Sequence, residues 1–128
     1  MHDSPFHSLG GEDVVRKLAT RFYDHMDASE PELAKIHDCD EKGAVSARTR
    51  ERFTRFLIEW LGGPTVYSPV EGHPRLRMRH GHVAIDEAMR DAWLRCMSKA
   101  MDDIGATGEV RQFLDGRFAE VADFLRNR

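Results

Sequence analysis

Four stretches of the chain carry apolar residues at the spacing of an amphipathic helix. In the first, from residue 12 to about residue 28, apolar side chains follow the i, i+3, i+4, i+7 rhythm that gives a helix one buried face, at Val14, Val15, Leu18, Phe22 and Met26. The same rhythm recurs over about residues 45–61, 86–104 and 108–126. The pattern therefore predicts four substantial helices.

The segments between these helices are polar or rich in helix-breaking residues. A short apolar piece at Leu33, Ala34 and Ile36 predicts one turn of helix followed by a polar loop. Residues 62–84 contain four glycines and three prolines, too many for a long helix or a central strand. At most one short helical turn fits there, at about residues 76–80. We therefore expect an all-α fold with an irregular middle and no strand.

Length and charge narrow the class of protein. A chain of 128 residues is about one domain, and we expect a single domain over residues 9–128 with an N-terminal extension over residues 1–8. The net charge of −3 disfavours nucleic acid as the main partner. No secretory signal and no membrane-spanning run are visible, so we expect a cytoplasmic protein that does not bind a membrane. Cys39 and Cys96 are expected to be free thiols.

The irregular stretch holds the most unusual composition in the chain. The segment GHPRLRMRHGHVAI, residues 72–85, has three histidines and three arginines. A structureless loop of this length inside a compact domain is usually functional. A histidine in a basic loop is more often solvated than a ligand, but His80 follows the apolar Leu76 and Met78 and precedes an amphipathic helix.

The residues around His80 favour a cofactor over a bare metal ion. A hydrolytic metal site needs two or three converging ligands, and His80 with His82 does not make a convincing set. A single imidazole among apolar helices suits haem, because the porphyrin supplies four nitrogens and needs only one axial ligand from the protein.

At this point the sequence resembles a known family, the group II truncated haemoglobins of bacteria. The resemblance runs from about residue 9 to residue 125 and rests on RFYDHM, LGGPTVYSPVEGHPRLRMRHGHVAI and RDAWLRCM. It implies a shortened globin, a two-over-two helical sandwich that holds haem b (iron protoporphyrin IX). It also implies that His80 is the proximal ligand of the haem iron.

The resemblance further implies a set of distal residues around the bound ligand. Tyr23 and Trp93 match positions whose phenol and indole groups donate hydrogen bonds to the ligand. His37 falls where many relatives have tyrosine or phenylalanine, Thr49 where longer globins have the distal histidine, and Phe53 one helical turn further on. If His37 faces the ligand, the donor set changes with pH in the neutral range.

The remaining expected haem contacts surround the porphyrin. Arg79, with Arg77 and Tyr67, is placed to meet the propionates, because arginine pairs well with carboxylates. The expected cofactor-binding residues as a set are Phe56, Leu57, Tyr67, Leu76, Arg79 and Met97. Without the resemblance, Tyr23 and Trp93 are better explained as core aromatic residues, whereas a solvated loop position explains His37 equally well.

Three functions compete on this basis. The first is reversible binding of dioxygen and of other diatomic ligands (CO, NO), with slow release of dioxygen and a role in oxygen binding or transport. The second is an enzyme, a nitric oxide dioxygenase or a peroxidase acting on peroxide. Such a dioxygenase needs an external reductase, since the chain has no nucleotide-binding fingerprint. The third is a haem-based sensor or electron-transfer protein. A sensor usually needs an output domain, for which 128 residues leave no room, and six-coordinate electron transfer needs a second strong axial ligand, for which the distal side offers only His37.

Overall fold

The computed structural model describes residues 4–72 and 83–127 of the 128-residue chain, and these residues form helices and loops. The helices in chain order are α1 (Pro5–Leu9), α2 (Glu12–Ser29), α3 (Pro31–Ala34), α4 (Ala47–Trp60), α5 (Ser68–Glu71), α7 (Glu87–Asp103) and α8 (Gly108–Leu125). Within this part of the chain the β-structure is limited to one isolated antiparallel bridge, between Cys39 and Val45. The prediction of an all-α fold is confirmed.

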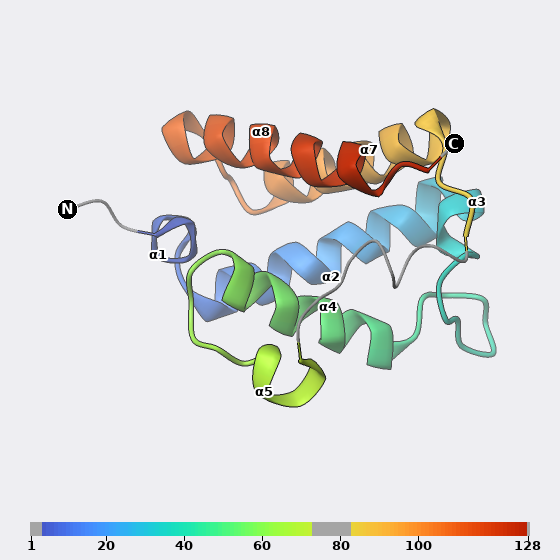
Figure 1. Cartoon of the computed structure of the whole chain (residues 1–128), viewed down its shortest axis with the longest axis horizontal. Coiled ribbons are helices and arrows are strands. Elements are labelled where there is room, and N and C mark those ends of the chain that lie inside the picture. Colours follow the sequence, from blue (N-terminus) through green and yellow to red (C-terminus); the bar gives the residue numbers. More distant parts are fainter. Residues whose placement is uncertain (1–3, 73–82, 128) are drawn as a thin grey trace.

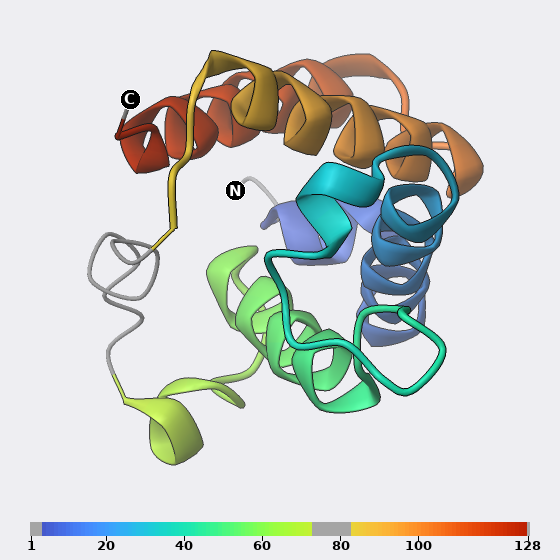
Figure 2. The same cartoon turned by 90° about the vertical axis from the view of Figure 1, so that its right-hand side faces the viewer.

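The long helices form two layers of two. Figure 1 shows α7 and α8 side by side above α2 and α4, and Figure 2 shows the same layers from the end. The two helices within each layer run in opposite directions. Helix α2 packs against both α4 and α7, so it joins the layers. None of the described helices is long and apolar enough to cross a membrane.

The sequence of α2 explains its central place. Its buried side chains recur every three or four residues, so they form a stripe that meets α4 on one side and α7 on the other. They are Val15, Leu18, Ala19, Phe22, Tyr23 and Met26. Tyr23 is the one member of this stripe with a polar group.

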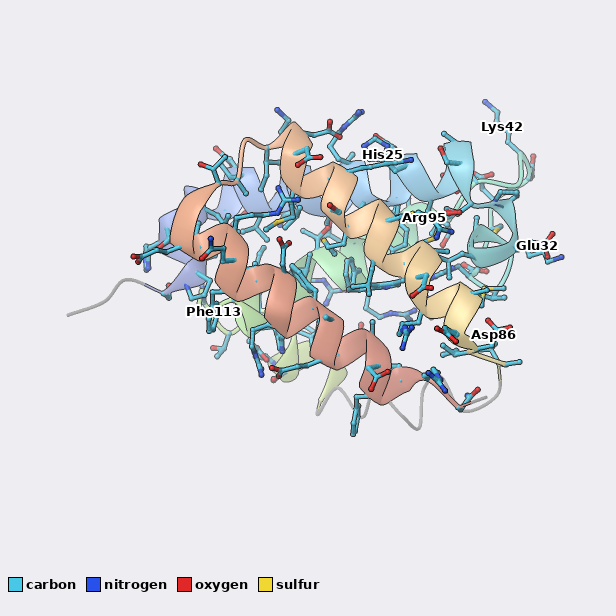
Figure 3. All side chains as sticks on the ribbon, turned by 90° about the horizontal axis from the view of Figure 1, so that it is seen from above. His25, Glu32, Lys42, Asp86, Arg95 and Phe113 are labelled. Carbon is cyan, nitrogen blue, oxygen red and sulfur yellow. The ribbon has the colours of Figure 1, made fainter. Side chains whose placement is uncertain are left out.

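Side chains fix where the helices of each layer begin. The hydroxyl of Ser46 accepts a hydrogen bond from the amide of Thr49 at 3.2 Å and caps α4. Asp86, labelled in Figure 3, caps α7 by accepting from the amide of Met89 at 2.9 Å. Because Thr49 lies on the first turn of α4, the cap also places this residue for the site described below.

The four long helices predicted from the sequence are present, each within two residues of its expected ends. The helical turn expected near Leu33 is α3. Two short helices were not predicted. Helix α5 lies in the breaker-rich stretch, where only a turn near residues 76–80 was expected, and that turn lies outside the described residues. Helix α1 packs on α2 and α8 and buries Phe6.

Candidate functional site

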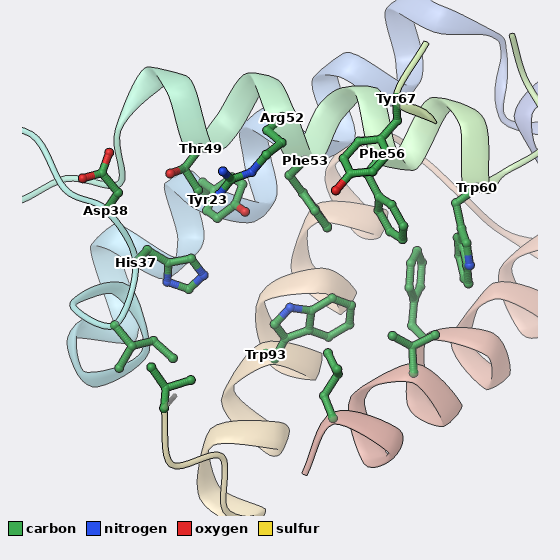
Figure 4. A pocket seen from close by; sticks show the side chains of 15 residues that line it. Tyr23, His37, Asp38, Thr49, Arg52, Phe53, Phe56, Trp60, Tyr67 and Trp93 are labelled. Carbon is green, nitrogen blue, oxygen red and sulfur yellow. The ribbon is translucent and has the colours of Figure 1, made fainter. Parts of the chain in front are cut away.

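A cavity of about 400 Å³ lies between α4 and the layer formed by α7 and α8 (Figure 4). Its lining residues come from α2, α4, α7, α8 and the loops between them. They are Tyr23, Ile36, His37, Asp38, Thr49, Arg52, Phe53, Phe56, Trp60, Tyr67, Val83, Trp93, Phe118, Val121 and Leu125. The cavity is therefore built from segments that are far apart in the sequence.

Aromatic side chains form most of the wall. Six rings make a closed circuit of contacts in which neighbouring ring centroids are between 5.2 and 6.2 Å apart. In order around the circuit they are Phe22, Phe53, Phe56, Trp60, Phe118 and Trp93, and all of them except Phe22 line the cavity. Because rings packed at these distances are held by several neighbours at once, the wall is a rigid apolar surface.

One end of the cavity is polar, and Tyr23 is its central residue. The Tyr23 side chain is only 4% exposed, and its ring contacts those of Phe22 and Phe53. No group in the described residues hydrogen-bonds to its hydroxyl. Burial raises the pKa of Tyr23 well above the usual range of a phenol, an effect that Arg52 and Arg50 partly offset. The hydroxyl therefore stays protonated and can donate to a ligand in the cavity.

Trp93 and His37 lie at the same end (Figure 4). The indole N–H of Trp93 can only donate, and it too has no acceptor among the described residues. The His37 ring lies edge-on to Tyr23, with 5.8 Å between the centroids. Its Nδ1 lies 2.9 Å from the carbonyl oxygen of Leu33, so in the neutral imidazole Nδ1 carries the proton and Nε2 is an acceptor.

One face of α4 supplies five of the lining residues. They follow helical spacing along the cavity, at Thr49, Arg52, Phe53, Phe56 and Trp60. Sequence analysis did not identify Arg52 and Trp60 as site residues, although both have the same spacing as the residues that it did identify. Arg52 makes no ion pair with any described residue, so its guanidinium is available to an anion.

The structure brings most of the residues expected around the ligand together. Tyr23, His37, Thr49, Phe53 and Trp93 all line the cavity, together with two of the expected cofactor contacts, Phe56 and Tyr67.

The other expected contacts lie elsewhere. Leu57 and Met97 are buried in the core and do not line the cavity, so their contact with a cofactor stays a prediction. His80, Leu76, Arg77 and Arg79 lie outside the described residues.

The cavity fits the haem expected from the sequence in size and in chemistry. Sites for small organic cofactors have volumes of about 300–1,000 Å³ and mostly apolar walls with a few placed polar groups. Here aromatic rings provide the apolar wall, an N–H and an O–H donor without an acceptor among the described residues lie at one end, and Arg52 can pair with a carboxylate. Haem has a flat apolar ring, acidic side chains and a small polar ligand on its iron. These three parts match the aromatic wall, Arg52 and the two donors, respectively.

Comparisons with known proteins agree with this geometry. The bacterial-like globin family model matches residues 4–127. A group 2 truncated haemoglobin of Bacillus subtilis is 37% identical over 126 residues, which cover 98% of this chain and 90% of the relative. The crystal structure of a truncated oxygen-avid haemoglobin from Bacillus subtilis has a TM-score of 0.86 at 38% identity, over 98% of this chain and 100% of the other.

A second structure leads to the same family. A cold-adapted truncated haemoglobin from the Antarctic bacterium Pseudoalteromonas haloplanktis has a TM-score of 0.89 at 35% identity, over 98% of this chain and 99% of the other. The likeness therefore extends over nearly the whole chain in both sequence and structure.

Proposed function

The chain belongs to the bacterial-like globin family as a group II truncated haemoglobin, and from this premise we propose that it binds dioxygen and other diatomic ligands beside Tyr23 and Trp93. The observation that carries the proposal is the pair of donors at the polar end of a largely aromatic cavity, neither of which has an acceptor in residues 4–72 and 83–127. Both groups line the cavity, so a ligand there that accepts hydrogen bonds can pair with them.

Membership of the family implies a haem cofactor, and we propose that it is haem b with His80 as its axial ligand. Haem supplies the iron that binds the diatomic ligand. Support for His80 comes from Val83, which lines the cavity and follows His80 by three residues, so at most about 11 Å can separate the two along the chain. Arg52 is proposed as a partner of the haem carboxylates, besides the arginines expected for that role from the sequence.

The two donors predict slow release of dioxygen. Each hydrogen bond to the ligand contributes roughly 0.5–1.5 kcal/mol, and more where the acceptor carries partial charge. Loss of both donors therefore corresponds to release that is about tenfold faster or more.

The test is the dissociation rate of dioxygen from the reduced, haem-loaded protein. The variant combines Tyr23→Phe with Trp93→Phe, which removes both donors and keeps both positions aromatic. Trp60→Phe is the matched control, because Trp60 lines the cavity away from Tyr23 and is not one of the expected cofactor contacts. We expect release at least tenfold faster from the double variant and little change in the control. Equal rates in all three proteins refute the proposed roles of Tyr23 and Trp93.

A second candidate function follows from the same donors. A protein that retains dioxygen is a poor carrier, and it is better suited to oxidise a small reactive molecule. With nitric oxide the balance is NO + O₂ + e⁻ → NO₃⁻, and the electron must come from an external reductase. Mixing the oxygenated protein with nitric oxide tests this function: one nitrate per haem supports it, and release of unreacted dioxygen contradicts it.

A further inference from the structure

Arg50 of α4 contacts Tyr23 at the polar end of the cavity but does not itself line the cavity. Its guanidinium carbon is 5.6 Å from the centroid of the Tyr23 ring. Its nitrogens donate to Asp24 Oδ1 at 3.0 Å, to Asp27 Oδ2 at 2.5 Å and to the carbonyl oxygen of Val45 at 3.0 Å. The guanidinium is therefore held in place against α2 and against the aromatic ring.

Arg50 and Asp27 together hold the peptide groups of Val45. Arg50 donates to the Val45 carbonyl, while Asp27 Oδ1 accepts from the Val45 amide at 3.1 Å. The Val45 side chain is buried, with 2% exposure. Because both backbone groups and the side chain have partners, Val45 fixes the end of the loop that runs from α3 to α4. We refer to Arg50, Asp27 and Val45 as the loop clamp.

The loop clamp extends to the segment that carries His37. Val45 forms the isolated bridge with Cys39, and the amide of Ser46 donates to the carbonyl of Asp38 at 2.8 Å. The residue before Asp38 is His37, whose ring lies against Tyr23. Arg50 thus contacts the side chain of Tyr23 directly and, through Val45, holds the backbone next to His37.

We propose that Arg50 is a positioning residue that sets the relative placement of Tyr23 and His37, and hence how strongly the polar end of the cavity holds a diatomic ligand. The effect on the ligand rests on the proposed function. The effect on the loop does not, because it depends on contacts between protein groups alone.

Two physical effects lead to this role. The planar guanidinium, fixed by three hydrogen bonds, is a rigid support against the Tyr23 ring, and a cation over the ring face makes the phenol a better donor. Replacement of Arg50 also removes the cation that pairs with Asp24 and Asp27. The end of the loop then loses the hydrogen bond to the Val45 carbonyl and the positive charge that offsets the two carboxylates.

The test uses the variant Arg50→Met, with Arg50→Lys as a conservative variant that keeps the charge. The matched control is Arg111→Met. Arg111 has a similarly covered side chain and bonds the carboxylates of Asp102 and Asp115 and the carbonyl of Ala106, but it does not line the cavity. It also donates to the carbonyl and the hydroxyl of Ser98, so its replacement removes at least as many hydrogen bonds as that of Arg50.

The first readout is the haem-loaded, reduced protein. We expect Arg50→Met to shift or broaden the carbon monoxide stretching band and to accelerate dioxygen release about threefold to tenfold. Arg50→Lys should recover part of this change, and Arg111→Met should leave both quantities as in the unmodified protein. An unchanged band with release within about twofold in Arg50→Met overturns the proposed effect on Tyr23.

The second readout needs no haem and uses the two cysteines of the chain. Cys39 lies in the loop, half-buried, with its thiol 3.5 Å from the Ala34 carbonyl oxygen, whereas Cys96 is buried in α7. We expect Arg50→Met to accelerate thiol labelling of Cys39 more than that of Cys96, and Arg111→Met not to do so. Equal acceleration at both cysteines indicates general destabilisation and overturns the loop clamp.

The two readouts separate the two proposals. A protein that takes up no haem refutes the proposed function, while selective labelling of Cys39 in Arg50→Met still supports the loop clamp. Conversely, normal haem and dioxygen binding with equal labelling of both cysteines leaves the proposed function intact and refutes the inference.

Discussion

At the scale of single residues, the protonation of Tyr23 depends on its surroundings. Phenols ordinarily ionise near pH 10, but the buried Tyr23 ring is packed among aromatic side chains, which raises its pKa. Burial of this ring thus keeps the hydroxyl a donor at every physiological pH. The polar end of the cavity therefore keeps one hydrogen-bond donor whose protonation does not change over the physiological pH range.

This raised pKa predicts an alkaline loss of stability with a definite sign. Above the ordinary phenol pKa of 10.0, Tyr23 releases its proton in the unfolded chain but keeps it in the folded protein. Stability is therefore complete below pH 10 and falls as pH rises toward the raised pKa, by up to about 1.4 kcal/mol per pH unit.

Tyr23→Phe should remove this contribution. The free energy of unfolding, measured by denaturant titration between pH 9 and pH 11, should fall less steeply with pH in the variant than in the unmodified protein. Parallel curves for the two proteins would contradict a buried, protonated Tyr23.

At the scale of elements, the short helix α1 packs on the residues that follow α4 and restricts which side chains fit there. The amide of Phe6 donates to the carbonyl of Leu61 at 2.9 Å, and the Phe6 ring lies over Gly63. A Cβ on Gly63 would lie 2.7 Å from the Phe6 ring and 2.8 Å from the Ile58 carbonyl oxygen. Glycine is therefore required by close packing at this position.

Gly63→Ala should destabilise the protein by about 1–3 kcal/mol, because neither the ring nor the backbone oxygen can move freely. Gly116→Ala is the matched control, since a Cβ there meets no atom within 4 Å and alanine favours the helix by about 1 kcal/mol. Denaturant unfolding should thus show opposite changes for the two variants. A neutral Gly63→Ala would mean that α1 does not pack on the end of α4.

The elements that sequence analysis missed have a common physical reason. Helices α1 and α5 are four or five residues long, too short to show a hydrophobic period, and each has a proline in its first turn. Pro5 and Pro69 were interpreted as part of an extension and as a helix breaker, yet proline is favoured at the start of a helix because its missing N–H is not needed there. The four long helices were predictable because their apolar stripes span several turns.

The candidate site was predictable in part for a similar reason. Tyr23 and Trp93 came from the family resemblance, since their helical spacing alone also fits a core aromatic residue. Phe118, Val121 and Leu125 carry the ordinary spacing of a buried helix face, and no sequence signal distinguishes a face against a cavity from a face against another helix. That Arg52 has no ion pair within the part of the chain that the structure describes could be recognised only once its neighbours were placed.

At the scale of the whole molecule, the C-terminus closes the wall of the cavity. Asn127 exchanges two hydrogen bonds with the backbone of Ile85, both of 2.8 Å, and its side-chain amide donates to the Val83 carbonyl at 2.9 Å. The residues that follow the segment containing His80 are thereby tied to the end of α8. The two layers, the loop clamp and this C-terminal contact together enclose one cavity with one polar end.

The central claim is that this cavity holds haem through His80 and binds dioxygen at its polar end. The most direct test is the visible absorption spectrum of the purified, haem-loaded protein, reduced under argon and then exposed to oxygen, beside His80→Ala prepared in the same way. We predict a five-coordinate reduced spectrum that converts to a long-lived oxygenated form, and loss of haem retention in His80→Ala. A protein that stays colourless with added haemin, or a fully loaded His80→Ala with the same spectrum, would contradict the account.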